Sequence, residues 1–477
     1  MDLPRIRRVW KRVFALAWPV MAEQTFRTAM RTTDVVVSAL FSPAAVVAIG
    51  LADLYARFPL RIGLGLGGGA IALSSQDTGA SETATRDEAI TQAVLLGALA
   101  GIPFVLFGLF LGEAAIDVFG RLIGRETPPE VVSLGSAYLA IVFATAPARH
   151  VALVAARALQ GTGDTRTPMY VNVLANSVNI VGSVVLGLGL FGLPRLEIVG
   201  VGLATATANV LTAGLLCAAI RGPWTDAGFV RPRDPTIARQ LLRVSAPRVA
   251  EGFSSEAAEF PFNALLLGFE EAVNAGFQIG RRVYQQVTGP LSRGYNVAAS
   301  VLVGQALGAG DPDEARFDGW AVAGLALVSV GSIGLALVAL APRVVRLFTS
   351  DPATVEYAVD FAGVYGLAGG ALACFSSLSG ALQGASETRI PFAARLTGMF
   401  GLFLGASWVL GRTAGLGPPG AYVGVFLAYC WMALVVAVGF RHSGWAARAA
   451  GMMAERGSGD GAAAGNDDQA AGSDDQA

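Results

Sequence analysis

Long apolar runs separated by short polar stretches dominate the chain. A run of about 20 apolar residues is long enough to cross the hydrocarbon core of a bilayer as a helix. Twelve such runs are present, at residues 13–40, 44–73, 88–112, 131–157, 167–191, 198–220, 237–267, 271–303, 317–341, 354–383, 390–412 and 419–441. The pattern therefore predicts an all-α polytopic membrane protein with twelve transmembrane helices.

One phrase occurs twice. Ala158–Pro168 reads ALQGTGDTRTP and Ala381–Pro391 reads ALQGASETRIP, at an offset of 223 residues (381 minus 158). Pro19 likewise recurs as Pro247, at an offset of 228 (247 minus 19). A period near half the chain indicates duplication of a large unit. With six spans in each half, we expect two pseudo-symmetric six-helix bundles in a parallel repeat, with the substrate in a central cleft.

Polar segments set the predicted domain boundaries. Residues 1–221 form an N-terminal six-helix lobe, and residues 237–445 form the C-terminal one. A proline- and arginine-containing stretch, residues 222–236, reads as a cytoplasmic linker. The last segment, residues 446–477, is mostly Gly, Ala, Ser, Asp and Gln, and predicts a disordered cytoplasmic tail.

Composition and loop charges agree with a membrane protein. The chain is 53% hydrophobic and only 14% charged, whereas soluble domains carry about 25% charged residues. Arginine and lysine are in excess on the side of the N-terminus. The positive-inside rule therefore predicts a multi-pass cell-membrane protein with both termini cytoplasmic. No nucleophile–base set, metal cluster or nucleotide-binding motif is evident, so we expect a non-enzyme.

The first span and the first copy of the phrase resemble a known family. An aspartate, Asp34, follows Pro19 by fifteen positions (34 minus 19), and the stretch ALQGTGDTRTPMYVNVLANSVNIVG contains an Asn-Ile-Val element at Asn179. Over about residues 10–445 the chain resembles multidrug and toxic compound extrusion (MATE) transporters. The aspartate in the first helix suggests their DinF-like branch, of the archaeal type.

The resemblance implies a V of two six-helix bundles that exports organic, often cationic, drugs or metabolites in exchange for H+ or Na+ by alternating access. It implies no cofactor beyond that coupling ion. The expected partners are small-molecule substrates and membrane lipid, with no nucleic acid, and the expected state is a monomer.

Asp34 is the principal candidate for ion coupling. A carboxylate inside a span is costly unless it is paired, solvated or functional, and protonation or sodium binding relieves that cost. The matching aspartate of the family has this role. The alternative is a structural ladder on one helix face, formed by Glu23, Arg27, Arg31 and Asp34.

The fifth span places Asn172, Asn176 and Asn179 on one helix face. Amide oxygens suit a hard cation, so Asn176 and Asn179 are cation-coupling candidates, with a possible Na+ at Asp34 and Asn179. Asparagines in membrane helices also bond neighbouring helices. The family pattern has an aspartate four residues after the asparagine, but Ser183 stands here. The missing carboxylate should weaken sodium binding, and it leaves H+ versus Na+ open.

Two other helices add candidates. Thr207 resembles the family's threonine ligand and fits the spacing better than Thr205, although membrane threonines often bond their own backbone. In the second span, Asp53 and Arg57 are one helical turn apart. Their simplest interpretation is a local ion pair in a water-accessible cleft.

The seventh span contributes Glu256 and Glu259, which share a helix face. With Asp53 and Arg31, they make up the predicted substrate cleft. They could form a second protonation site or a wall that attracts cations. The alternative is pairing with Arg281 and Arg282 of the eighth span.

A different transporter class is also compatible with the charges. A lipid-linked oligosaccharide flippase on a related scaffold would need cationic residues in its cleft to hold pyrophosphate. The candidates for that role are Arg27, Arg31, Arg57, Arg61, Arg281 and Arg282. A non-transporting membrane scaffold, without a central cleft, is a third possibility.

Overall fold

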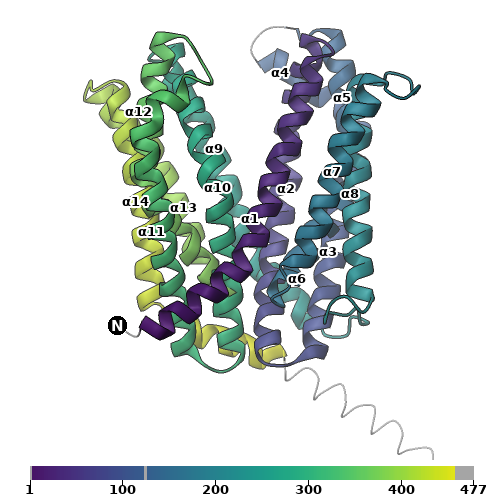
Figure 1. Cartoon of the computed structure of the whole chain (residues 1–477), viewed down its shortest axis with the longest axis vertical. Coiled ribbons are helices and arrows are strands. Elements are labelled where there is room, and N and C mark those ends of the chain that lie inside the picture. The colour runs from purple at the N-terminus through teal and green to yellow at the C-terminus, as the bar shows by residue number, and fades with distance from the viewer. Residues whose placement is uncertain (1–2, 123–125, 457–477) are drawn as a thin grey trace, which may run out of the picture.

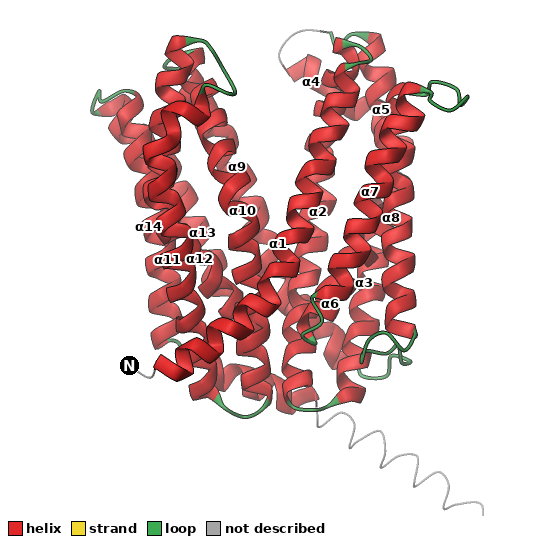
Figure 2. Cartoon of the chain, in the orientation of Figure 1, coloured by secondary structure: helices red, strands yellow, loops and turns green. Residues whose placement is uncertain are grey.

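A computed structural model describes residues 3–122 and 126–456 of the chain. All the regular structure in those ranges is helical (Figure 2). Two bundles of helices meet at one end and diverge toward the other, so that the chain has the shape of a V (Figure 1). The predicted all-α class is confirmed.

The helices follow the two predicted halves. The first half contains α1 (Leu3–Ala39), α2 (Pro43–Gly79), α3 (Thr83–Phe110), α4 (Gly112–Leu122), α5 (Pro129–Ala144), α6 (Ala146–Gly161), α7 (Arg166–Leu188) and α8 (Glu197–Arg221). The second half contains α9 (Pro235–Leu267), α10 (Glu271–Gly308), α11 (Pro312–Val345), α12 (Pro352–Gly384), α13 (Arg389–Thr397), two π-helical segments (Gly398–Ala406 and Val409–Thr413) and α14 (Pro418–His442).

Twelve spanning segments are present in the described residues. Eight helices are long and apolar enough to cross a membrane, counting Arg389–Thr413 as one, and α5 with α6 form a ninth that is bent by 49°. The other three are α1, α9 and α10, which are equally long but carry many of the charged side chains. The short helix α4 was not predicted, because it lies in the polar stretch between two apolar runs.

The first halves of α1 and α9 cross between the lobes. Val13 of α1 is part of the second-lobe core, and Leu241 of α9 is part of the first-lobe core. Each helix contains an internal proline, Pro19 or Pro247, after its crossing portion. A proline removes one helical hydrogen bond and permits a bend. The lobes are therefore interlocked, and the predicted boundaries at residues 1–221 and 237–445 do not separate their cores.

The repeated phrase forms two matching turns, each after the fourth span of its half. Gly163 has φ +95° and Ser386, its counterpart at an offset of 223 (386 minus 163), has φ +58°. The backbone N–H of Asp164 donates to Leu159 at 3.1 Å, and that of Glu387 donates to Leu382 at 2.8 Å. Both turns therefore have the same backbone geometry.

Ordered structure extends beyond the predicted start of the tail. Residues 445–456 are helical. Trp445 is buried in the second-lobe core and Met452 in the first-lobe core, so this helix covers the junction of the lobes. The prediction of disorder from residue 446 is wrong as far as Arg456, because this alanine- and methionine-containing stretch buries apolar side chains against both lobes. Residues 457–477 lie outside the described part.

The linker is anchored to α3 rather than loose. The Glu88 carboxylate accepts hydrogen bonds from the backbone N–H groups of Arg233 (2.5 Å) and Asp234 (2.6 Å). Gln92 of the same helix donates to the Asp234 carbonyl at 2.8 Å. These bonds hold the start of α9 against the first lobe.

Candidate functional site

Asp34 lies in a buried polar cluster of the first lobe. The Ser183 hydroxyl of α7 donates to Asp34 Oδ1 at 2.8 Å. Asn179 and Ser183 are both 0% exposed, and Asp34 is 9% exposed. Asn179 and Ser183 are one helical turn apart, so both face the same side of α7. The structure therefore brings Asp34 and Asn179 together and adds Ser183 as the direct partner.

The Asn179 amide satisfies all of its neighbours in only one orientation. In that orientation its NH2 group donates to Asp34 Oδ1 at 3.2 Å, and its oxygen accepts from the Thr205 hydroxyl at 3.1 Å. This orientation is assigned from the hydrogen-bond network. The Asp34 carboxylate then accepts from two donors, a hydroxyl and an amide.

Thr205, not Thr207, belongs to this cluster. Thr207 is exposed, whereas Thr205 is half-buried and faces Asn179. Two residues along a helix differ by about 200° in direction, so only one of the threonines can face α7. The structure does not bring the predicted Thr207 to this cluster, because the glycine spacing carries no information about the helix face.

The other asparagines of α7 have different environments. Asn172 donates to the Pro168 carbonyl at 2.9 Å within its own helix. Asn176 is 9% exposed, and its Nδ2 has no partner within the described residues. Asn176 Nδ2 is therefore a buried donor without an acceptor there, whereas Asn172 is already satisfied by the backbone.

The charged ladder on α1 forms only in its first step. Arg27 donates to Glu23 at 2.8 Å. Arg31 is exposed, and no ion pair joins it to Asp34 in the described part of the chain. The hydrogen-bonded environment of Asp34 thus replaces the ion pair that was its structural alternative.

Glu256 joins the two lobes. Arg57 and Arg61 of α2 donate to its two carboxylate oxygens at 3.0 and 2.5 Å. The predicted Asp53–Arg57 pair is therefore wrong, because Arg57 reaches across to the other lobe. Asp53 stays exposed, with Arg31 among its electrostatic neighbours.

Glu259 follows the alternative that was weighed for it. Its carboxylate pairs with Arg281 of α10 at 2.5 Å. Arg281 also lies over the Phe277 ring, 5.2 Å from its centroid. The charges of Glu256 and Glu259 are therefore both balanced by arginines. Neither glutamate gives the cleft an unpaired negative charge that would attract cations. No group of three His, Cys, Asp or Glu residues suited to a metal ion occurs in the described ranges.

The MatE family profile matches residues 19–185 and 260–409, which together are more than half of the chain. The chain belongs to the MATE family. It is thus a membrane transporter of a multidrug-efflux family and not an enzyme. The matched ranges contain Asp34, Asn179 and Ser183, as well as both copies of the repeated phrase.

Curated MATE relatives are similar along most of the chain. A probable multidrug resistance protein NorM of Rhodopseudomonas palustris is 29% identical over 421 residues, which cover 86% of this chain and 87% of the relative. The multidrug resistance protein PmpM of Pseudomonas aeruginosa is 28% identical, with 91% of each chain covered. Assignment to the DinF-like branch and the archaeal type stays a prediction.

Solved MATE structures share the fold. A MOP superfamily transporter from Pyrococcus furiosus, described as having a binding pocket of reverse polarity, superposes with a TM-score of 0.82 at 20% identity, covering 93% of this chain and 96% of that one. An outward-facing multidrug resistance MATE transporter superposes with a TM-score of 0.80, also at 20% identity, covering 93% and 96%.

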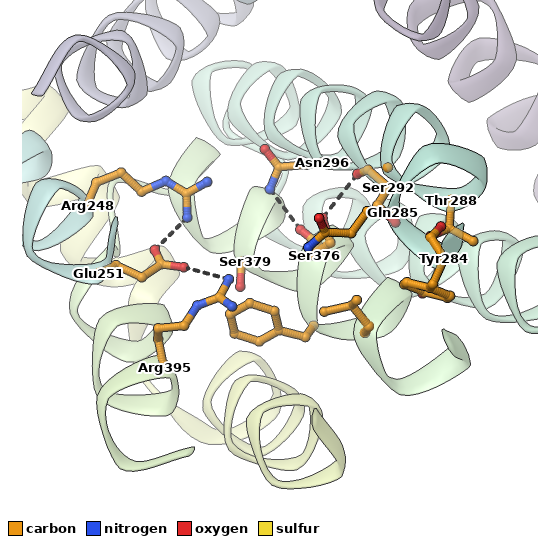
Figure 3. Close-up of a pocket in the computed structure, with 13 residues that line it drawn as sticks. Arg248, Glu251, Tyr284, Gln285, Thr288, Ser292, Asn296, Ser376, Ser379 and Arg395 are labelled. Carbon is orange, nitrogen blue, oxygen red and sulfur yellow. Dashed lines mark hydrogen bonds and ion pairs between the residues drawn. The ribbon is translucent and has the colours of Figure 1, made fainter. Parts of the chain in front are cut away.

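This MATE chain also has a cavity of about 150 Å³ in its second lobe, lined by residues of α9, α10, α12 and α13 (Figure 3). Glu251 accepts from Arg248 at 2.6 Å and from Arg395 at 3.4 Å. We did not predict this site. The one signal in the sequence is that Glu251 repeats Glu23, at an offset of 228 (251 minus 23).

Proposed function

We propose that the protein exports organic, often cationic, small molecules in exchange for inward-moving H+, with Asp34 as the coupling residue. The observation that carries the proposal is the buried Asp34 carboxylate, which is held by Ser183 and Asn179 instead of an arginine. Such a group can alternate between a charged and a protonated form within a span. The multidrug resistance relatives support drug export.

The donors around Asp34 favour H+ over Na+. Sodium binds to oxygen ligands, whereas the Ser183 hydroxyl and the Asn179 NH2 both direct hydrogens at Asp34. Ser183 also stands where a second carboxylate would add charge to a sodium site. A protonated Asp34 would accept fewer hydrogen bonds than the charged form. Release of the Ser183 hydroxyl or the Asn179 NH2 group would then change how α1 packs against α7.

Export from vesicles under separate gradients tests the coupling. We expect an inward proton gradient to drive ethidium export. A sodium gradient alone should not drive it. Asp34→Asn should slow export at least about tenfold, because the loss of a proton-transfer or charge-switching group typically costs this much or more. The control is Glu130→Gln, an exposed carboxylate at the start of α5. Wild-type rates and ion dependence in Asp34→Asn would overturn the assignment.

The flippase alternative gains little from the arginines. Of the six candidates for holding pyrophosphate, Arg27, Arg57, Arg61 and Arg281 pair with glutamates. These ion pairs occupy guanidinium N–H groups in the cleft that a pyrophosphate would need, so the pairing favours export of small molecules.

The proposed topology has the termini and the closed end of the V in the cytoplasm, in a monomer of the cell membrane. The likeness to an outward-facing MATE transporter supports this orientation. Labelling of single cysteines at residue 84 with a membrane-impermeant maleimide tests it. Intact cells should protect residue 84, and broken membranes should expose it.

A further inference from the structure

The second-lobe cavity presents donors that lack acceptors. Ser379 is 1% exposed, and its hydroxyl oxygen has no hydrogen-bond partner in the described part of the chain. Arg395 Nε is buried and is likewise without a partner there. Both residues line the cavity, and both are labelled in Figure 3. A buried donor without an acceptor is costly, so the site lacks an acceptor group.

Positive charge around the cavity exceeds negative charge. Arg248 and Arg395 share a single carboxylate, that of Glu251. Guanidinium groups do not lose their protons, so a bound anion is the remaining way to balance them.

The cavity walls suit an organic anion with an apolar body. Phe375 and Leu372 line the same space as the arginines. The Arg395 guanidinium lies over the Phe375 ring, 4.5 Å from its centroid, so its plane is held in place. A volume of about 150 Å³ accommodates a carboxylate together with a small ring.

We propose that this cavity binds the oxyanion group of a small organic molecule, a carboxylate in the first instance, through Arg395 and Ser379. The inference rests on the proposed export function and adds organic anions to its substrates. The same oxyanion chemistry could be supplied by a lipid phosphate, which the experiment distinguishes.

Calorimetric titration of the full chain in phosphatidylcholine nanodiscs tests the proposal, with salicylate as the anion and salicylamide as its neutral counterpart. We expect salicylate to bind about tenfold more tightly than salicylamide, because charge-assisted hydrogen bonds are about twice as strong as neutral ones. Arg395→Gln should weaken salicylate binding about tenfold, and Ser379→Ala about threefold. Arg121→Gln, which removes an exposed arginine of α4, should leave it unchanged.

Arg395→Lys and Ser379→Ala keep the test valid if Arg395→Gln does not fold. Lysine retains the charge but not the two-pronged geometry, so it should weaken salicylate binding by severalfold. Equal affinities for salicylate and salicylamide, or equal affinities in wild type and in the folded Arg395 and Ser379 variants, would overturn the proposal.

A second titration in nanodiscs that contain phosphatidylglycerol separates the two sources of the anion. Unchanged affinity identifies the soluble anion as the ligand, and weaker affinity in wild type alone identifies lipid phosphate as a competitor for the same pocket. Because binding needs no ion gradient, absent salicylate binding with intact ethidium export contradicts only the anion pocket. Intact binding with absent export contradicts only the proposed function.

Discussion

The Gln76 side chain donates to the backbone carbonyl of Gly384 at 2.8 Å, which ties α2 of the first lobe to the repeated turn of the second. The repeat supplies the reciprocal contact, since Gln305 of α10 donates to the Gly161 carbonyl at 3.3 Å. Each copy of the phrase thus offers a carbonyl to a glutamine of the opposite lobe. The two bonds close the narrow end of the V.

Gln76→Leu should open that end. It leaves the buried Gly384 carbonyl without a donor, which costs about 1–3 kcal/mol and shifts the equilibrium constant between the closed and open states by about fivefold to 150-fold. Spin labels at exposed residues 84 and 313, in a background without the native cysteines, would report a longer inter-lobe distance. The control is Gln278→Leu, whose bond to Asn263 at 2.6 Å stays within one lobe. Unchanged distance distributions in Gln76→Leu would show that this hydrogen bond does not hold the narrow end of the V closed.

Arg456 reinforces this end from the terminal helix. Its guanidinium donates to Asp77 at 2.7 Å and to Gln240 at 2.7 Å, and its side chain is almost fully buried. Arg456→Gln leaves Asp77 buried without its counter-charge, so we expect a loss of about 3–5 kcal/mol in unfolding or opening free energy. Adding Asp77→Asn should restore much of it, as a double-mutant cycle in thermal unfolding would show. If the stability losses of Arg456→Gln and Asp77→Asn simply add in the double variant, the two side chains do not stabilise each other.

Thr205 and Thr207 provide a matched pair of substitutions. Thr205→Val removes the hydroxyl that bonds Asn179, and should slow proton-driven export about threefold to tenfold, the value of one hydrogen bond. Thr207→Val changes an exposed side chain and should leave the rate unchanged. Initial export rates of ethidium at equal expression measure both. Equal rates for the two variants would remove Thr205 from the coupling cluster.

Ser183→Asp should change the ion requirement. It places a second carboxylate beside Asp34 and removes the hydroxyl that now donates to it. Two carboxylates with the Asn179 amide form an oxygen site that suits a hard cation. We expect stimulation of export by a sodium gradient, which wild type lacks. Ser183→Thr retains the hydroxyl, so export by this variant should stay independent of sodium. Export by Ser183→Asp that sodium does not stimulate would contradict this account.

Sequence reasoning worked best where the signal was periodic. The apolar runs located the twelve spans because membrane thickness imposes a minimum length, whatever the neighbouring helices do. Asp34 and Asn179 were found because polar groups are costly in a span. Which of Thr205 and Thr207 lies beside Asn179 depended on helix rotation, which local spacing does not determine. Ser183 was noted as a departure, but its bond to Asp34 required the packing of α1 on α7.

The sequence by itself determined the number of spans, their duplication and the buried carboxylate, because hydrophobic length and repeated motifs are properties of the chain. Only the tertiary structure decided which charges pair. Arg57 bonds Glu256 across the lobes instead of Asp53 on its own helix, and Arg456 enters the core from a segment predicted to be a disordered tail. Ion pairs form with the partner that folding brings nearest and desolvates most, and that partner is often remote along the chain.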